Sequence, residues 1–135
     1  MGPMGLRFGA AGRALLSIAV AGGILLAGCV PGTDLPETCD DASVTFPATL
    51  VEERLEPSTL EACRGQQVTI QLRVERDAIF HLHGYDAELP AREVRTGEDV
   101  ALTFEASRAG QFPIEIHTTD GPGEAEVGTL VVHEG

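Results

Sequence analysis

The sequence predicts an all-β domain, either a sandwich of two sheets or a small barrel. Apolar and polar residues alternate with period 2 in several short segments, and turn-forming residues separate these segments at close spacing. No long segment has the 3.6-residue periodicity of an amphipathic helix. Short strands of this kind pack around a single core, which a domain of about 100 residues can bury.

The clearest strand follows Gly65. Its alternating apolar residues are Val68, Ile70, Leu72 and Val74, with polar residues between them. Because successive side chains of a strand point to opposite faces, these four residues would share one buried face. We expect this strand to form the centre of the domain.

The same alternation predicts further strands downstream. They cover residues 79–83, a short segment at Val94, residues 100–106, 112–117 and 126–133. In the first of them, Phe80 and Leu82 would face the core, while His81 and His83 would face the other way.

The segment before Gly65 is less regular. Residues 43–51 are expected to form a strand, and Pro47 places that strand at a sheet edge because proline cannot donate a ladder hydrogen bond. Residues 52–63 are ambiguous. In that segment Ser58, followed three residues later by Glu61, could cap a short helix.

The N-terminus has the features of an export signal. Two arginines precede an uncharged apolar run at residues 14–27, which is shorter than the about 20 residues of a membrane-spanning helix. The run ends in Leu26-Ala27-Gly28-Cys29, which resembles the lipobox of bacterial lipoproteins. The resemblance implies that residues 1–28 are removed and that Cys29 is lipidated. The lipid would then hold the protein on the outer face of a membrane in the bacterial cell envelope, outside the cytoplasm.

Charge limits the partners that the protein can have. The chain has a formal charge of −12, and without residues 1–28 it would keep seven arginines against 21 acids, a charge of −14, with no lysine. Such a surface repels the phosphates of nucleic acids, which are therefore not expected as partners. The acidity suits a cationic partner, including a metal ion, but is equally typical of a solvated surface.

The two remaining cysteines, Cys39 and Cys63, form an even pair in an exported protein, where a disulfide is the default. Closing this loop would stabilise the fold by about 3 kcal/mol in the chain-entropy model. Thiolate metal ligation is disfavoured because the spacing is not of the CxxC type. Residues 29–42 are expected to form the lipidated cysteine and a flexible tether, and residues 43–135 the domain.

One short motif suggests a ligand site. His81 and His83 stand at i and i+2, so in a strand their rings would lie on one face about 6.5–7 Å apart and could reach one metal ion. Gly84 permits a turn after them. Tyr85 and Asp86 are expected to hold that turn, by a phenol packed inward and a carboxylate that accepts backbone amides.

Several segments together resemble a known family. They are Gly65-Gln66-Gln67-Val68, His81-Leu82-His83-Gly84-Tyr85-Asp86, Val100-x-Leu102-x-Phe104, Gly110-Gln111-Phe112 and Gly128-Thr129-Leu130-Val131-Val132. Their order and spacing resemble the cupredoxin (plastocyanin-like) domains, including exported bacterial ones. The resemblance implies a cupredoxin-like Greek-key β-sandwich and a copper site between the histidine-bearing turn and the last hairpin.

The sequence departs from the family where the chemistry is decided. The equivalent hairpin, residues 112–128, contains no cysteine, and both Met1 and Met4 would leave with the signal. A blue-copper site needs a cysteine thiolate, and its axial ligand is commonly methionine. Blue-copper electron transfer is therefore not expected.

The remaining candidate ligands are histidines. By resemblance His83 takes the position of the family's first ligand, His81 lies two residues before it, and His117 lies on the hairpin with Glu115 and Asp120 beside it. Three imidazoles with a carboxylate or water can bind Cu(II) or Zn(II). The alternative is that the histidines are ordinary polar residues of a strand face.

Two functions remain open. The first is binding of copper, or alternatively zinc, by a membrane-tethered domain for storage, delivery or sensing. The second is a metal-free interaction module with a vestigial site, which would bind an exported protein partner. No nucleophile–base pair, phosphate-binding glycine loop or paired carboxylates are evident, and the further copper motifs of multicopper oxidases are missing. The sequence thus predicts that the protein is not an enzyme.

Overall fold

The computed structural model describes residues 35–118 and 123–135. The expected signal peptide, Cys29 and the first part of the expected tether, through residue 34, lie outside these residues, as does Asp120. Within the described part of the chain, no helix is long and apolar enough to cross a membrane.

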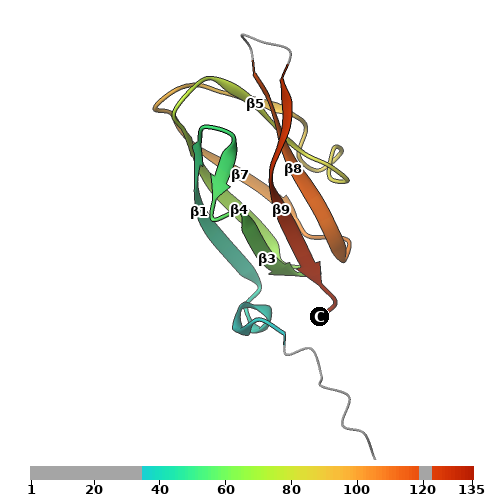
Figure 1. The fold of residues 1–135 in the computed structure, drawn as a ribbon. Helices are drawn as coiled ribbons and strands as arrows, with labels where there is room; N and C mark the ends of the chain where they lie inside the picture. The colour runs from blue at the N-terminus through green and yellow to red at the C-terminus, as the bar shows by residue number, and fades with distance from the viewer. Residues whose placement is uncertain (1–34, 119–122) are drawn as a thin grey trace, which may run out of the picture. The chain divides into compact units, whose positions relative to one another are not determined.

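The described residues form two β-sheets (Figure 1). One sheet has the order β2-β1-β4-β7, with β1 at Ser43–Val51, β2 at Arg54–Glu56, β4 at Gln67–Val74 and β7 at Asp99–Glu105. The other has the order β3-β9-β8-β5-β6, with β3 at Thr59–Cys63, β5 at Ala78–Leu82, β6 at Arg92–Val94, β8 at Gly110–Thr118 and β9 at Glu124–His133. The chain crosses repeatedly from one sheet to the other, and the predicted all-β sandwich is confirmed.

The core lies between the sheets and follows the predicted alternation. In β4 and β7 the buried side chains are those of Val68, Ile70, Leu72, Val74, Val100, Leu102 and Phe104. In the other sheet they include those of Leu60, Phe80, Leu82, Ile114, Ile116, Leu130 and Val132. Because the inner face of β5 and β8 is filled by these apolar residues, the alternate residues of the same strands face outward.

Pro47 lies where one side of β1 is open. β1 pairs in parallel with β4 from Ser43 to Leu50, whereas β2 covers its other side only from Thr49 onward. The predicted edge position is therefore confirmed for the first part of the strand, where a missing backbone N–H is tolerated.

The possible helix in residues 52–63 does not form, and that alternative is wrong. The segment contains the strands β2 and β3, and β3 pairs in parallel with β9. Leu60 and Ala62 are buried with a spacing of two residues. A short helix beginning at Ser58 could not put both side chains into the core together with the ladder to β9, so tertiary pairing overrides the local capping signal.

Part of the expected tether is held against the domain. Glu37–Asp40 forms a 3-10 helix, η1, and the predicted disulfide joins Cys39 to Cys63 with their Cα atoms 5.3 Å apart. The buried side chain of Gln66 reinforces this attachment. Its amide donates to the carbonyls of Thr38 and Asp41, and its oxygen accepts from the backbone N–H of Cys63 at 2.8 Å.

The hairpin of β8 and β9 contains a β-bulge. Ile114 pairs with Gly128, whereas Glu115 pairs with Glu126, so Val127 is the additional residue. β9 begins at Glu124, two residues before the predicted start. The bulge changes the phase of β9, so that its glutamates share the outward face with Glu115 while Val127 remains buried.

Gly84 forms the turn that follows β5. Its φ is +81°, a conformation that side chains with a Cβ rarely adopt, and an added Cβ would lie 2.8 Å from the ring of Phe112. Phe112 in turn packs edge-on against the buried ring of Tyr85, with centroids 4.8 Å apart. The Tyr85 hydroxyl donates to the carbonyl of Arg108 at 2.8 Å, which confirms the prediction of an inward phenol.

We predict that Gly84→Ala lowers the free energy of unfolding by about 2–5 kcal/mol. About 1–2 kcal/mol comes from the positive φ and about 1–3 kcal/mol from overpacking against Phe112. Urea denaturation of the purified variant measures the loss.

Gly97→Ala is the matched control, because Gly97 has a φ of +73° but an added Cβ would meet nothing within 4 Å. Only the conformational loss of about 1–2 kcal/mol is expected there. Equal losses for the two variants would contradict the steric role of Phe112.

Candidate metal site

The candidate site lies on the outward face of the neighbouring strands β5 and β8. In their antiparallel register His81 pairs with Glu115 and Ile79 pairs with His117. The backbone N–H of His83 donates to the carbonyl of Pro113 at 3.0 Å, which continues the pairing one residue beyond β5. The motif and the hairpin histidine are thereby brought to the same surface.

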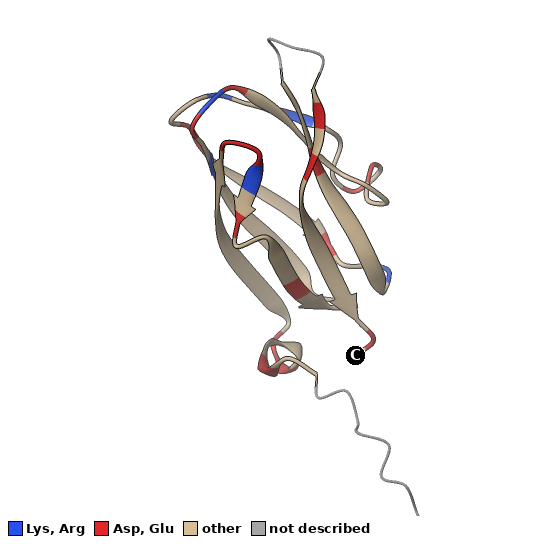
Figure 2. Ribbon diagram, in the orientation of Figure 1, with Lys and Arg blue, Asp and Glu red and all other residues tan. Residues whose placement is uncertain are grey.

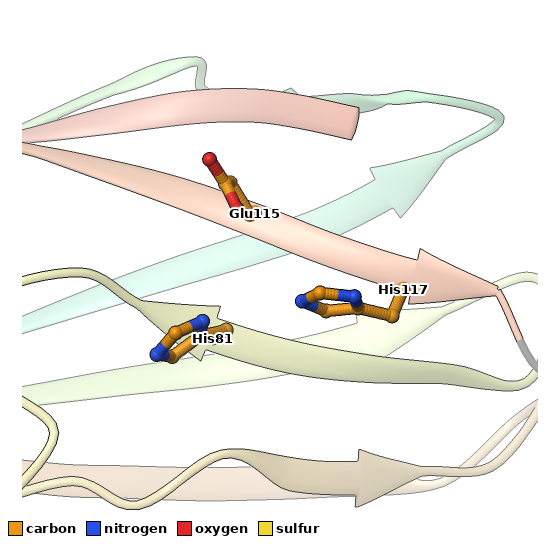
Figure 3. A group of neighbouring side chains, drawn as sticks. All are labelled: His81, Glu115 and His117. Atoms are coloured by element: carbon orange, nitrogen blue, oxygen red, sulfur yellow. The ribbon is translucent and has the colours of Figure 1, made fainter. Parts of the chain in front are cut away.

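The first group of possible ligands contains His81, Glu115 and His117. Each offers one ligand atom, and these atoms all lie within 4.8 Å of one another. All three residues are half-buried, and the ring centroids of the two histidines are 6.1 Å apart. Figure 3 shows the three side chains on β5 and β8, with the ring of His117 directed toward His81.

The second group contains His83, Glu115 and Glu124, again with ligand atoms within 4.8 Å of one another. Nε2 of His83 and Oε2 of Glu115 are 2.6 Å apart. Both atoms are buried, yet neither has a partner with hydrogen-bond geometry. We therefore describe the short contact as an ion pair that lacks the geometry of a hydrogen bond. Glu115 is the one residue that belongs to both groups.

Asp86 contacts His81 in addition to its expected role in the turn. Nε2 of His81 donates to Oδ1 of Asp86 at 2.6 Å. This hydrogen bond lowers the pKa of the Asp86 carboxyl, and backbone amides in the same turn lower it further. The predicted turn role is thus joined by a contact with a candidate ligand, since imidazole ligands commonly donate their second N–H to a carboxylate.

The short contact also changes the protonation of its own two groups. The carboxylate of Glu115 raises the pKa of His83, with smaller contributions from Asp86 and Glu124. The contact with His83 lowers the pKa of Glu115, as does a hydrogen bond with the carboxyl group of Glu124. Each group therefore favours the charged form of the other.

The structure brings all the described candidate residues to one surface but separates them into two groups. His81 and His83 are adjacent, with ring centroids 4.2 Å apart, yet they belong to different groups. Glu115 lies between the groups, and Asp120 is outside the described residues. His133 lies outside both groups, half-buried and with Nε2 3.3 Å from Oε2 of Glu61.

Sequence reasoning misses Glu124. Strand periodicity predicts that its strand begins two residues later, which leaves Glu124 in the loop. In the structure it pairs with His117 across the hairpin. Pairing the two arms of the hairpin residue by residue from the turn would have identified it. Figure 2 shows that acidic residues occur in both sheets and in the connecting loops.

No protein-family model and no curated protein matches the sequence. Among solved structures, the multicopper oxidase mgLAC matches with a TM-score of 0.56 at 14% identity, over 69% of this chain and 39% of its own. Auracyanin A, a "blue" copper protein from Chloroflexus aurantiacus, matches with a TM-score of 0.51 at 18% identity, over 67% of this chain and 99% of its own. The domain has a cupredoxin-like fold.

A copper nitrite reductase from Nitrosomonas europaea also resembles this cupredoxin-like domain, with a TM-score of 0.54 at 13% identity, over 68% of this chain and 42% of its own. The chain thus spans less than half the length of the oxidase and the reductase. At these identities the similarity concerns the fold, and ligands have to be argued from the side chains of this chain.

The prediction that the protein is not an enzyme is wrong, because the fold does not exclude enzymatic activity. Structures with the same fold include a multicopper oxidase and a copper nitrite reductase. The prediction depended partly on the missing copper motifs of multicopper oxidases, and partly on the absence of a nucleophile–base pair and of paired carboxylates, which argues against hydrolytic chemistry only. For a cupredoxin-like domain that absence is uninformative, because oxidases and reductases do not need those groups.

We predict that Glu115→Gln destabilises the metal-free domain most between about pH 4.5 and 6.5. Because the pKa of His83 is raised in the folded protein, its contribution to the free energy of unfolding is fully present below the ordinary pKa of 6.5. This contribution is lost as the pH rises through the raised pKa. Because the pKa of Glu115 is lowered, its contribution to the free energy of unfolding is fully present above the ordinary pKa of 4.5 and is lost as the pH falls through the lowered pKa. Urea denaturation in chelator at a series of pH values measures the difference.

Glu53→Gln is the control, because Glu53 is paired at 3.6 Å with Arg76, which stays charged throughout this range. The loss of stability caused by Glu53→Gln should not decline above pH 6.5. A difference between wild type and Glu115→Gln that is the same at all pH values would contradict the role of the His83 contact.

Proposed function

We propose that this cupredoxin-like domain binds a divalent transition-metal ion, copper in preference, through His81, Glu115 and His117. The observation that carries the proposal is the placement of these three ligand atoms within 4.8 Å of one another on the outward face of β5 and β8. Two imidazoles and a carboxylate, completed by water, suit Cu(II) and also Zn(II).

The surroundings of the three side chains fit a bound cation. The hydrogen bond from Nε2 of His81 to Asp86 orients the ring and leaves Nδ1 as the nitrogen that could bind an ion. Oε2 of Glu115 already faces Nε2 of His83 at 2.6 Å, so the other oxygen of the carboxylate, Oε1, is the one that could bind an ion beside His81 and His117. The acidic composition of the chain also favours a positively charged ligand.

The available ligands define the chemistry of the proposed site. Both cysteines of the described residues form the disulfide, so a copper ion at this face would have nitrogen and oxygen ligands and no thiolate. The intense blue absorption of cupredoxins depends on a thiolate, and we propose a non-blue site used for storage, delivery or sensing.

The location that we propose is the outer face of a bacterial membrane, with lipid on Cys29. Support comes from the sequence Leu26-Ala27-Gly28-Cys29 after an apolar run. The disulfide between Cys39 and Cys63 is of the kind that persists in oxidising compartments.

One observation favours the second function, a metal-free module with a vestigial site that binds an exported protein. Each of the four histidines has a carboxylate within 4.0 Å, as in His83–Glu115 and His117–Glu124. Such pairs can satisfy the imidazoles without an ion. Metal titration distinguishes the two functions.

We predict that Cu(II) binds to the purified protein with an EPR spectrum of a tetragonal nitrogen and oxygen site and without intense blue absorption. Removal of a residue that only supports a metal ligand typically lowers metal affinity about 10–100-fold. The double variant His81→Ala/His117→Ala removes two ligands and should therefore lower the affinity for Cu(II) by more than this. Calorimetric titration measures the affinity.

His133→Ala is the matched control, since His133 is also a histidine paired with a glutamate but lies outside both ligand groups. It should bind copper as the wild type does. Undetectable binding by the wild type, or unchanged binding by the double variant, would rule out the proposed site and favour the metal-free module.

We also predict that Cys29→Ser moves the protein from the membrane fraction to the soluble fraction of the bacterial envelope, because the lipid that provides membrane affinity cannot be attached. Fractionation followed by immunoblotting measures the distribution. The variant Cys39→Ser/Cys63→Ser should remain with the membrane, and retention of Cys29→Ser there would contradict lipid anchoring at this residue.

A further inference from the structure

We propose that the site holds two metal ions bridged by the carboxylate of Glu115. This inference rests on the proposed function and adds a second ion to it. One ion would use His81 and His117 together with Glu115, and the other would use His83 and Glu124 together with the same glutamate. The ligands would come from β5, the turn after it, β8 and β9.

The division into two groups is the observation that points to two ions. The ligand atoms of His81, Glu115 and His117 lie within 4.8 Å of one another, and so do those of His83, Glu115 and Glu124. No such group of described residues contains both His81 and His83, although their ring centroids are only 4.2 Å apart. A single ion therefore does not draw on all the histidines as they are placed, whereas two ions with a shared carboxylate use all three.

The contacts of Glu115 allow its two oxygens to serve different ions. Oε2 faces Nε2 of His83 at 2.6 Å, and both atoms are buried without a hydrogen-bond partner. That pairing assigns Oε2 to the group of His83 and Glu124. Oε1 is then the oxygen for the group of His81 and His117, and a carboxylate that binds one ion through each oxygen is a bridge.

The charges of the surrounding side chains counter the repulsion between two divalent ions. Glu115 and Glu124 supply negative charge as direct ligands, and Asp86 supplies a third carboxylate through its hydrogen bond to His81.

The test is the number of Cu(II) ions bound by the purified protein in calorimetric titration, combined with EPR. The wild type should bind two ions per chain, and the carboxylate bridge should couple their spins, so that the EPR intensity falls below that of two independent ions. Glu124→Gln should bind one ion with the full intensity of an isolated Cu(II). His117→Ala should also bind one ion, and Glu115→Gln should weaken both.

Glu124 is well suited to this test because its side chain is 60% exposed, so its substitution leaves the core intact. Glu61→Gln is the control: it removes another exposed glutamate beside a histidine, outside both groups, and should still bind two coupled ions. One ion in the wild type, or two ions that Glu124→Gln leaves in place, would overturn the two-ion site and leave the proposed function standing. No binding at all would overturn both.

Discussion

The antiparallel pairing of β5 with β8 is the constraint on which the rest of the candidate site depends. It places His81 opposite Glu115 and fills the inner face of the same two strands with Phe80, Ile114 and Ile116. A shift of one residue would turn every one of these side chains to the other face and bury the imidazoles and the carboxylate. The apolar core therefore fixes the arrangement of polar groups on the outside, and the same contacts that stabilise the sandwich position the candidate ligands.

The turn after β5 extends this arrangement. Gly84 lets the chain reverse direction against Phe112, which brings Asp86 back to His81 five residues earlier in the sequence. Tyr85 anchors the turn from inside through its hydrogen bond to Arg108. One face of this short segment is held by the core, and the other is free to carry charged groups. The six-residue motif is thus a structural unit as well as a source of ligands.

Much of the fold could be predicted from the sequence because local alternation and burial agree in β4, β5, β7 and β8. The failures lie where tertiary contacts decide the outcome. Ser58 and Glu61 match a helix cap, but Leu60 and Ala62 have to reach the core beside β9. In the site, the same-face histidines followed from strand geometry. The role of Glu115 between two groups and the participation of Glu124 did not, since strand periodicity begins β9 two residues after Glu124 and so does not pair this glutamate with His117.

The bulge also bears on how the hairpin reaches a single structure. If β8 and β9 continued the register of Ile114 and Gly128 without an additional residue, Glu126 would lie opposite Ile116 and both would face the core. Burying an unpaired carboxylate there would cost several kcal/mol, far more than the small penalty of a bulge. Glu124 would be turned inward with it. The acidic residues of β9 therefore act as folding determinants that select one hairpin register over its competitor, whatever cation their carboxylates later meet.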